Sequence, residues 1–211
     1  MLKSYELRNS PKFLRNEYEC VGYFNMPNIA KQEIDLNNMQ LISYSDTYSN
    51  DNETNKSKGV HFFIDDKRFE NIYLFPERSL NKLAQYRFVI TIDYSLYREM
   101  PRALQIYNTF RNRWIGAYWQ SKGLKVIPCI SWSDHTSYDY CFDGIEVGSI
   151  VAVGMIGCKA NKQAFMDGYN KMINVIKPSA IIVFGNPFNE MEGNIIPVDY
   201  LNSRRINRHG R

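Results

Sequence analysis

The fold is decided by one stretch, residues 86–134, which reads YRFVITIDYSLYREMPRALQIYNTFRNRWIGAYWQSKGLKVIPCISWSD. It begins with an apolar strand that ends at Asp93. A turn with Pro101 follows, then a long helix that closes near Gly123 and a second apolar strand at 125–132. Two strands joined by a helix in this way are parallel, and both faces of such a unit are buried. The segments on either side are therefore expected to extend the same sheet.

The same alternation of strands and helices continues outward from this unit. Further apolar strands are predicted at 39–45, 59–65, 149–156 and 180–185, and a helix with a buried stripe at 161–176. This order is typical of an α/β fold with a mostly parallel sheet of about six strands and covering helices. Six strands are too few for an eight-stranded barrel, so an open sheet is the first expectation and a truncated, barrel-like arrangement the alternative.

Three less regular segments complete the predicted architecture. The polar residues 45–59 are expected to form an exposed loop, residues 138–142 an edge strand, and the short apolar segment near 195–200 a further strand at an edge. The chain is divided into an N-terminal arm packed on the domain (1–38), a single α/β domain (39–200) and a basic C-terminal tail (201–211).

Composition excludes several classes of protein. With 44% hydrophobic and 23% charged residues, the 211-residue chain has the balance of a soluble globular protein, and no apolar run is long enough to span a bilayer. The first residues mix charges where a signal peptide needs an apolar block, so a cytoplasmic location is expected. The four cysteines form no C-x-x-C pair, which argues against a disulfide framework and a zinc site.

Polar residues follow the predicted strands at the ends where parallel α/β folds bind ligands. Asp65, Asp93 and Asp134 each come directly after a strand or close to its end. If they converge, they can hold Mg²⁺ through oxygen ligands or act as a general acid and base. The alternative is that each caps the helix or turn that follows it.

The helix at 102–120 and the turn before the helix at 161–176 offer groups for an anionic ligand. Asn108, Arg111 and Arg113 lie on a helix rich in Tyr and Trp, where guanidinium groups can pair with phosphate and aromatic rings with bases. Lys159 follows a glycine-containing strand-to-helix turn of the kind that binds phosphate. A packing helix with arginines reaching to solvent, and a simple tight turn, are the alternatives.

The tail carries Arg204, Arg205 and Arg208 without an acidic residue. These cations can strengthen binding to a nucleic-acid backbone by releasing counterions. The alternative is a solvated chain end. The net charge of +4 permits an anionic partner without identifying one.

Several unusual strings occur in one order: HFFIDDKRFE (61–70), DYSLYREMP (93–101), YCFDGIEVGSIVAV (140–153) and AFMDGYNKM (164–172). On these strings the chain resembles a family of unknown function, numbered four-four-one-seven, found in bacteria, bacteriophages and other mobile elements. The resemblance covers about residues 38–186. It implies a phage or mobile-element source and a bacterial host cytoplasm, but no activity and no site residue.

Three functions are therefore weighed. The first is a phage or mobile-element accessory protein that binds nucleic acid or a nucleotide-like anion at the carboxyl ends of the strands. The second is a metal-dependent enzyme acting on a phosphorylated or nucleotide substrate. The third is a protein that binds and inhibits a host or defence protein, with part of its 14% aromatic content as an exposed anchor surface.

Overall fold

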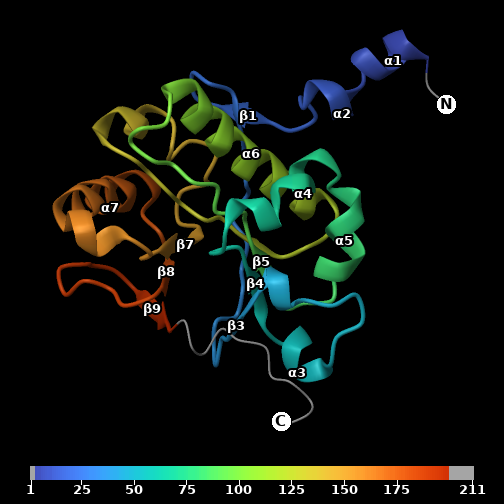
Figure 1. Ribbon diagram of the computed structural model, residues 1–211. Helices are drawn as coiled ribbons and strands as arrows, with labels where there is room; N and C mark the ends of the chain where they lie inside the picture. Colours follow the sequence, from blue (N-terminus) through green and yellow to red (C-terminus); the bar gives the residue numbers. More distant parts are fainter. Residues whose placement is uncertain (1–2, 200–211) are drawn as a thin grey trace.

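Parallel strands in chain order form the centre of the molecule (Figure 1). The computed structural model describes residues 3–199 and confirms the predicted α/β class. One parallel sheet contains β3 (Leu41–Ser43), β4 (Gly59–His61), β5 (Phe88–Ile90) and β6 (Val126–Ile127), and a second contains β7 (Ile150–Gly154), β8 (Ala180–Phe184) and β9 (Ile195–Val198). The apolar segment expected at an edge is β9, which pairs with β8.

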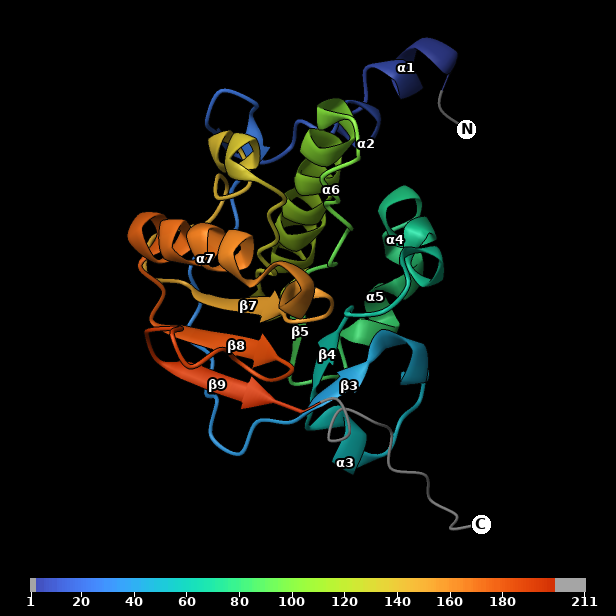
Figure 2. The same ribbon diagram turned by 60° about the vertical axis from the view of Figure 1, so that its left-hand side comes forward.

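The two sheets are joined and curve around a common interior. A parallel bridge pairs Cys129 with Ala152, so the residues after β6 connect to β7. Figure 2 shows the strands wrapping around in this order. No pairing joins β9 to β3 within residues 3–199, so the barrel is not closed in the described part of the chain. Of the two arrangements expected from the sequence, the structure adopts the truncated, barrel-like one.

Successive residues along the strands point alternately into the curve of the sheets and outward to the covering helices. Residues that point into the curve form one cluster, drawn from both sheets: Leu41, Phe88, Ile90, Ile127, Ala152, Ile182, Phe184 and Val198. Their neighbours in sequence point outward. Val60, Val89 and Val126 belong to a cluster with α4 and α6, and Val151, Ile181 and Val183 to one with α7. Burial on both faces explains why the strands are uninterrupted apolar runs.

The covering helices are α4 (Glu70–Leu74), α5 (Glu77–Leu83), α6 (Arg102–Ser121) and α7 (Lys162–Ile176). Pro101 precedes α6, and Gly123 follows it with a φ of 85° that favours glycine. The Asn161 side chain accepts a hydrogen bond from the Ala164 N–H and so caps α7, and Pro178 stands just after its end. The predicted helices at 102–120 and 161–176 are confirmed. None of the helices in residues 3–199 has the length and apolar character needed to cross a membrane.

The N-terminal segment divides at Arg15. The short helices α1 (Ser4–Arg8) and α2 (Pro11–Leu14) project from the body (Figure 1), and α1 has no buried residue. After Arg15 the chain packs on the domain through a hairpin of β1 (Cys20–Val21) and β2 (Met26–Pro27). Ile34 then joins the inner cluster.

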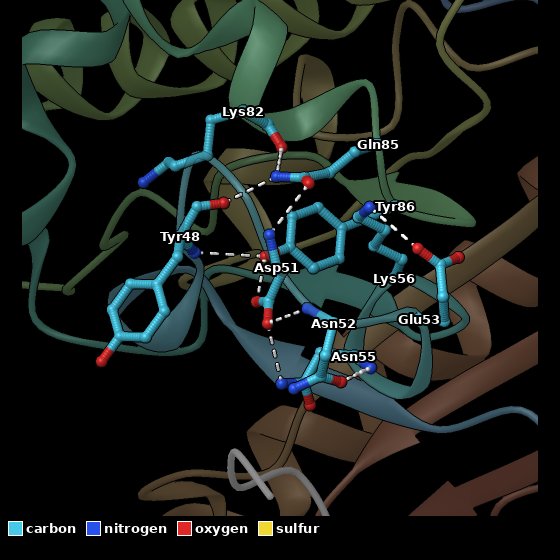
Figure 3. A network of polar contacts seen from close by, with 9 residues as sticks. All are labelled: Tyr48, Asp51, Asn52, Glu53, Asn55, Lys56, Lys82, Gln85 and Tyr86. Atoms are coloured by element: carbon cyan, nitrogen blue, oxygen red, sulfur yellow. Dashed lines mark hydrogen bonds and ion pairs between the residues drawn. The ribbon is translucent and has the colours of Figure 1, made fainter. Parts of the chain in front are cut away.

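The polar segment 45–59 is not the exposed loop predicted from its composition. It contains α3 (Glu53–Lys56), and Asp51 and Asn55 are buried. Asp51 accepts hydrogen bonds from the Tyr86 hydroxyl at 2.6 Å and the Asn55 side-chain amide at 3.0 Å, as Figure 3 shows. The low hydrophobicity of this segment predicted exposure, but its buried polar side chains form hydrogen bonds with one another and with Tyr86.

The edge strand predicted at 138–142 is also wrong. The chain there forms a 3-10 helix, η3 (His135–Asp139), followed by a turn. Tyr140 and Phe142 are buried in the cluster with α7. The alternation of apolar and polar residues therefore reflects a turn that buries two aromatic rings and not a strand with one solvated face.

Candidate ligand site at the mouth of the barrel

Polar side chains gather where β4, β5, β6 and β7 end, a region called here the mouth. Asp93, three residues beyond β5, is at its centre. Its Oδ1 accepts hydrogen bonds from the Ser131 hydroxyl at 2.6 Å and the Cys129 thiol at 3.5 Å. These two donors come from the neighbouring strand end, and they fix the orientation of the carboxyl group.

The second oxygen of Asp93 lies close to a glycine of the neighbouring sheet. A Cβ atom at Gly154, in β7, would lie 3.7 Å from Asp93 Oδ2 and only 3.0 Å from the Phe63 ring. No hydrogen bond to Oδ2 is formed within the described residues. One oxygen of Asp93 is thus held by two hydrogen bonds from the protein, whereas the other accepts none from the described residues.

The floor beneath this carboxyl group is aromatic. The rings of Phe63 and Phe184 stack at a centroid distance of 4.7 Å, and the His61 ring lies 4.5 Å from that of Phe184. His61 Nδ1 accepts the Phe63 N–H, and burial lowers the pKa of His61 to about 3, so the imidazole is neutral. The carboxyl group therefore lies next to a buried layer of uncharged rings.

Burial raises the pKa of Asp93 to about 6, although the hydrogen bonds from Ser131 and Cys129 oppose this. The negative charge of Asp66 raises it further. Asp66 accepts hydrogen bonds from the Ser95 hydroxyl at 3.0 Å and the Ser95 N–H at 3.2 Å, and burial also raises its pKa. A carboxyl group that titrates near neutrality is a common feature of functional sites.

The polar side of α6 is buried and supports the mouth from behind. The Asn108 side chain donates to the Ser95 carbonyl at 2.8 Å, and the Asn112 side chain donates to the Ile92 carbonyl at 2.6 Å. A cavity of about 10 Å³, lined in part by Tyr94, Asn108 and Ser131, lies between this face and the strand ends. The Tyr94 hydroxyl is buried without a hydrogen-bond partner. The space is that of a single water molecule.

The two arginines predicted to bind an anion are used inside the protein. Arg111 forms an ion pair with Glu70, and its guanidinium lies 3.9 Å from the centre of the Tyr94 ring. Arg113 is 2% exposed and donates to the backbone carbonyls of Cys141 at 2.5 Å and Asp143 at 2.8 Å. Those loop carbonyls need donors, which is why the polar side of the helix faces inward.

Two of the predicted acids have local partners. Asp65 is exposed, and its side chain accepts the Lys67 N–H at 3.1 Å, so it caps the 3-10 helix η2 (Asp66–Arg68). Asp134 accepts the Thr136 hydroxyl at 2.7 Å and the Thr136 N–H at 2.9 Å, and these hydrogen bonds lower its pKa. The structure thus gives both acids the capping role that was the alternative.

The remaining predicted residues have different positions. Lys159 is exposed in the 3-10 helix η4 (Cys158–Asn161), which follows β7 at the edge of the mouth. Within residues 3–199 no three His, Cys, Asp or Glu side chains are grouped as metal ligands, so Asp65, Asp93 and Asp134 do not come together there as one set of ligands. The arginines of the tail, Arg204, Arg205 and Arg208, lie outside the described residues.

Of the site, sequence reasoning placed Asp93, Asp66 and Ser131 at successive strand ends but did not show that Ser131 and Cys129 donate hydrogen bonds to Asp93. Burial raises the pKa of Cys158 to about 11, and the charge of Asp93 adds to this effect, which places the two side chains near each other. Ser131 and Cys129 come from the next strand end. The only signal for these neighbours was their shared position just beyond successive strands.

Comparison with known proteins gives a family and two relatives. A family described as a domain of unknown function, DUF4417, matches residues 18–201. The Gene 1 protein of Mycobacterium phage L5 is 34% identical over 175 residues, which are 82% of this chain and 76% of the relative. The Gene 1 protein of Mycobacterium phage D29 is 40% identical over 129 residues, 60% of this chain and 48% of the relative. No solved structure matches.

Proposed function

Because this chain belongs to the DUF4417 family, as its sequence strings predicted, and the family description contains no activity, we propose a function from the mouth alone. The protein binds a small nucleotide-like ligand there, and Asp93 accepts the N–H donors of its ring. The observation that carries the proposal is the divided role of the Asp93 carboxyl group, with Oδ1 held by Ser131 and Oδ2 without a hydrogen bond from the described residues.

The surroundings of Asp93 support a ring that carries a negative group. Phe63 and Phe184 are buried beneath the carboxyl group and give it an uncharged base. Lys159 is exposed in η4, directly after β7, so a cation lies on the segment that follows this strand end. An acceptor at the centre and a cation at the edge match a nucleobase with its phosphate. Since the two relatives are phage proteins, the role proposed is that of a phage or mobile-element accessory factor.

The proposal is tested with Asp93→Asn and a matched control, Asp65→Asn. Asn keeps the size of Asp, and Asp65 is an exposed capping residue near the same strand ends. Isothermal titration with a panel of ribo- and deoxynucleotides should find one that binds the wild-type protein. Affinity should fall at least tenfold in Asp93→Asn, about 1.4 kcal/mol, and stay unchanged in the control.

Two results would count against this function. The mouth is not a nucleotide site if no nucleotide binds or if Asp93→Asn binds as tightly as the wild type. Oligonucleotides belong in the same panel, because a salt-dependent affinity that survives Asp93→Asn would place nucleic-acid binding elsewhere on the chain.

A second candidate is an enzyme that acts on such a ligand. It is favoured by one observation, the pKa of about 6 at Asp93 beside a second carboxyl group, Asp66. An acid or base works best when its pKa is close to the operating pH. Incubation of the bound nucleotide with and without Mg²⁺, followed by phosphorus NMR, should then show turnover that rises with pH around 6 and is lost in Asp93→Asn. An unchanged ligand in both conditions leaves binding as the function.

A further inference from the structure

Of the fifteen large apolar side chains that are exposed within residues 3–199, nine fall into two groups. Within the described residues, the N-terminal arm, defined as residues 3–14, exposes Tyr5, Leu7, Phe13 and Leu14. A second group, called here the apolar rim, consists of Leu74, Phe75, Tyr97, Leu104 and Tyr107. Side chains of this kind are usually scattered singly over a monomer, so such a concentration indicates a contact surface.

The rim is contiguous on the body. The rings of Tyr73 and Tyr107 meet edge to face at 6.0 Å, and Leu74 and Phe75 follow Tyr73 at the end of α4. Leu104 lies one turn before Tyr107 on the same side of α6. The loop with Tyr97 is tied to this end of α6, because Gln105 donates to the Tyr97 carbonyl at 3.2 Å.

The arm is anchored beside the rim. The Arg15 guanidinium lies 4.0 Å from the centre of the Trp114 ring and donates to the Tyr73 carbonyl at 3.0 Å. Arg15 follows α2 in the left-handed conformation, with a φ of 57°. This conformation ends the helix and turns the chain toward Tyr73 and Trp114. The arm therefore starts next to Tyr73 and extends away from its own body (Figure 1), so its apolar side chains reach beyond the molecule that carries them.

From this geometry we infer that the protein forms a two-fold dimer in which the arm of each copy packs on the apolar rim of the other. The chain has both halves of a self-complementary surface, which is what an isologous contact requires. The inference concerns a different surface from the mouth and does not depend on the proposed ligand.

The available area agrees with a stable dimer. The arm and rim side chains are 38% to 63% exposed. At about 200 Å² for each large side chain, burial of these exposed parts removes roughly 900 Å² per copy. Stable protein interfaces bury about 800 Å² on each partner. The arm and rim together are thus large enough without any contribution from the rest of the surface.

The test is the mass of the full chain in solution, measured by sedimentation velocity over a range of concentrations. The wild type should be a dimer. Deletion of residues 2–14 and the substitution Leu104→Glu should each give monomers. The circular dichroism of Leu104→Glu should be unchanged, and that of the deletion should lose only the helical signal of α1 and α2. Val175→Glu is the matched control, because Val175 is 41% exposed on α7 and lies outside the arm and the rim, so this variant should remain dimeric.

Mixing the two monomeric variants distinguishes arm exchange from any other dimer. The Leu104→Glu chain has an intact arm, and the arm-deleted chain has an intact rim. Their mixture should form a heterodimer with one arm-on-rim contact and a dissociation constant at least tenfold above that of the wild type. A wild-type chain that stays monomeric overturns the inference, whether or not it binds some other protein. So does a dimer that survives both changes, or a mixture that stays monomeric.

Discussion

Replacing Asp93 by Asn should stabilise the protein above pH 6 and have little effect near pH 4. Burial raises the pKa of Asp93 from 3.8 to about 6, so the folded state binds this proton more tightly than the unfolded chain. A raised carboxyl pKa favours folding at low pH, and that stability is lost as the pH rises from about 4 to about 6. Asn carries no charge and so avoids the loss.

The size of this stabilisation follows from the shift in the pKa of Asp93. Two pKa units correspond to about 3 kcal/mol, and because Asp93 is partly exposed the expected gain is about 2 kcal/mol at pH 8. For a chain of this length, that raises the melting temperature by about 4 to 8 °C. Differential scanning calorimetry of both proteins between pH 4 and pH 8 measures the difference directly.

Asp134 provides a control whose effect on stability should change with pH in the opposite direction. Its hydrogen bonds from Thr136 lower its pKa, so its contribution to stability is present at neutral pH and is lost as the pH falls below 3.8. Asp134→Asn should therefore be less stable than the wild type at pH 7, and the difference should shrink in acid. If Asp93→Asn is less stable than the wild type at pH 8, or if its effect does not change with pH, the account of the buried carboxyl group is refuted.

Three further substitutions test the packing around the site and at the other end of the strands. Arg113→Met should cost about 3 kcal/mol in urea unfolding, because two buried loop carbonyls lose their donors. Asp51→Ala should cost about 2 kcal/mol, since a buried tyrosine hydroxyl loses its acceptor, whereas Glu53→Ala in an exposed ion pair should cost less than about 0.5 kcal/mol. Gly168→Ala should lower stability by about 1 to 3 kcal/mol and alter tryptophan fluorescence, because a Cβ there overlaps the Trp132 ring. Wild-type stability in any of the three would contradict the packing described.

The sequence predicted the strand-helix-strand unit at 86–134 because apolar periodicity is a local property. It did not distinguish an open sheet from a curved one. Parallel strands buried on both faces look the same in either arrangement. The curvature depends on contacts such as the bridge between Cys129 and Ala152 and the stacking of Phe63 on Phe184, which join distant parts of the chain.

The sequence was limited in a similar way in what it predicted about the candidate site. A position after a strand was enough to single out Asp93, but the same rule selected Asp65 and Asp134, which cap short helices. For α6, periodicity separated a polar side from an apolar side without showing which one is buried. Arg113 points inward because loop carbonyls need its donors, and those loops can be located only in the folded chain.

The central claim is that Asp93 is the ligand-binding group of the mouth, and its carboxyl carbon can be observed directly. Carbon NMR of the protein with labelled aspartate, assigned with Asp93→Asn, should show Asp93 titrating near pH 6. Addition of the nucleotide that binds should shift this resonance and its midpoint while the Asp134 resonance stays in place. A midpoint near 4, or a resonance that does not change when the nucleotide is bound, would contradict the claim.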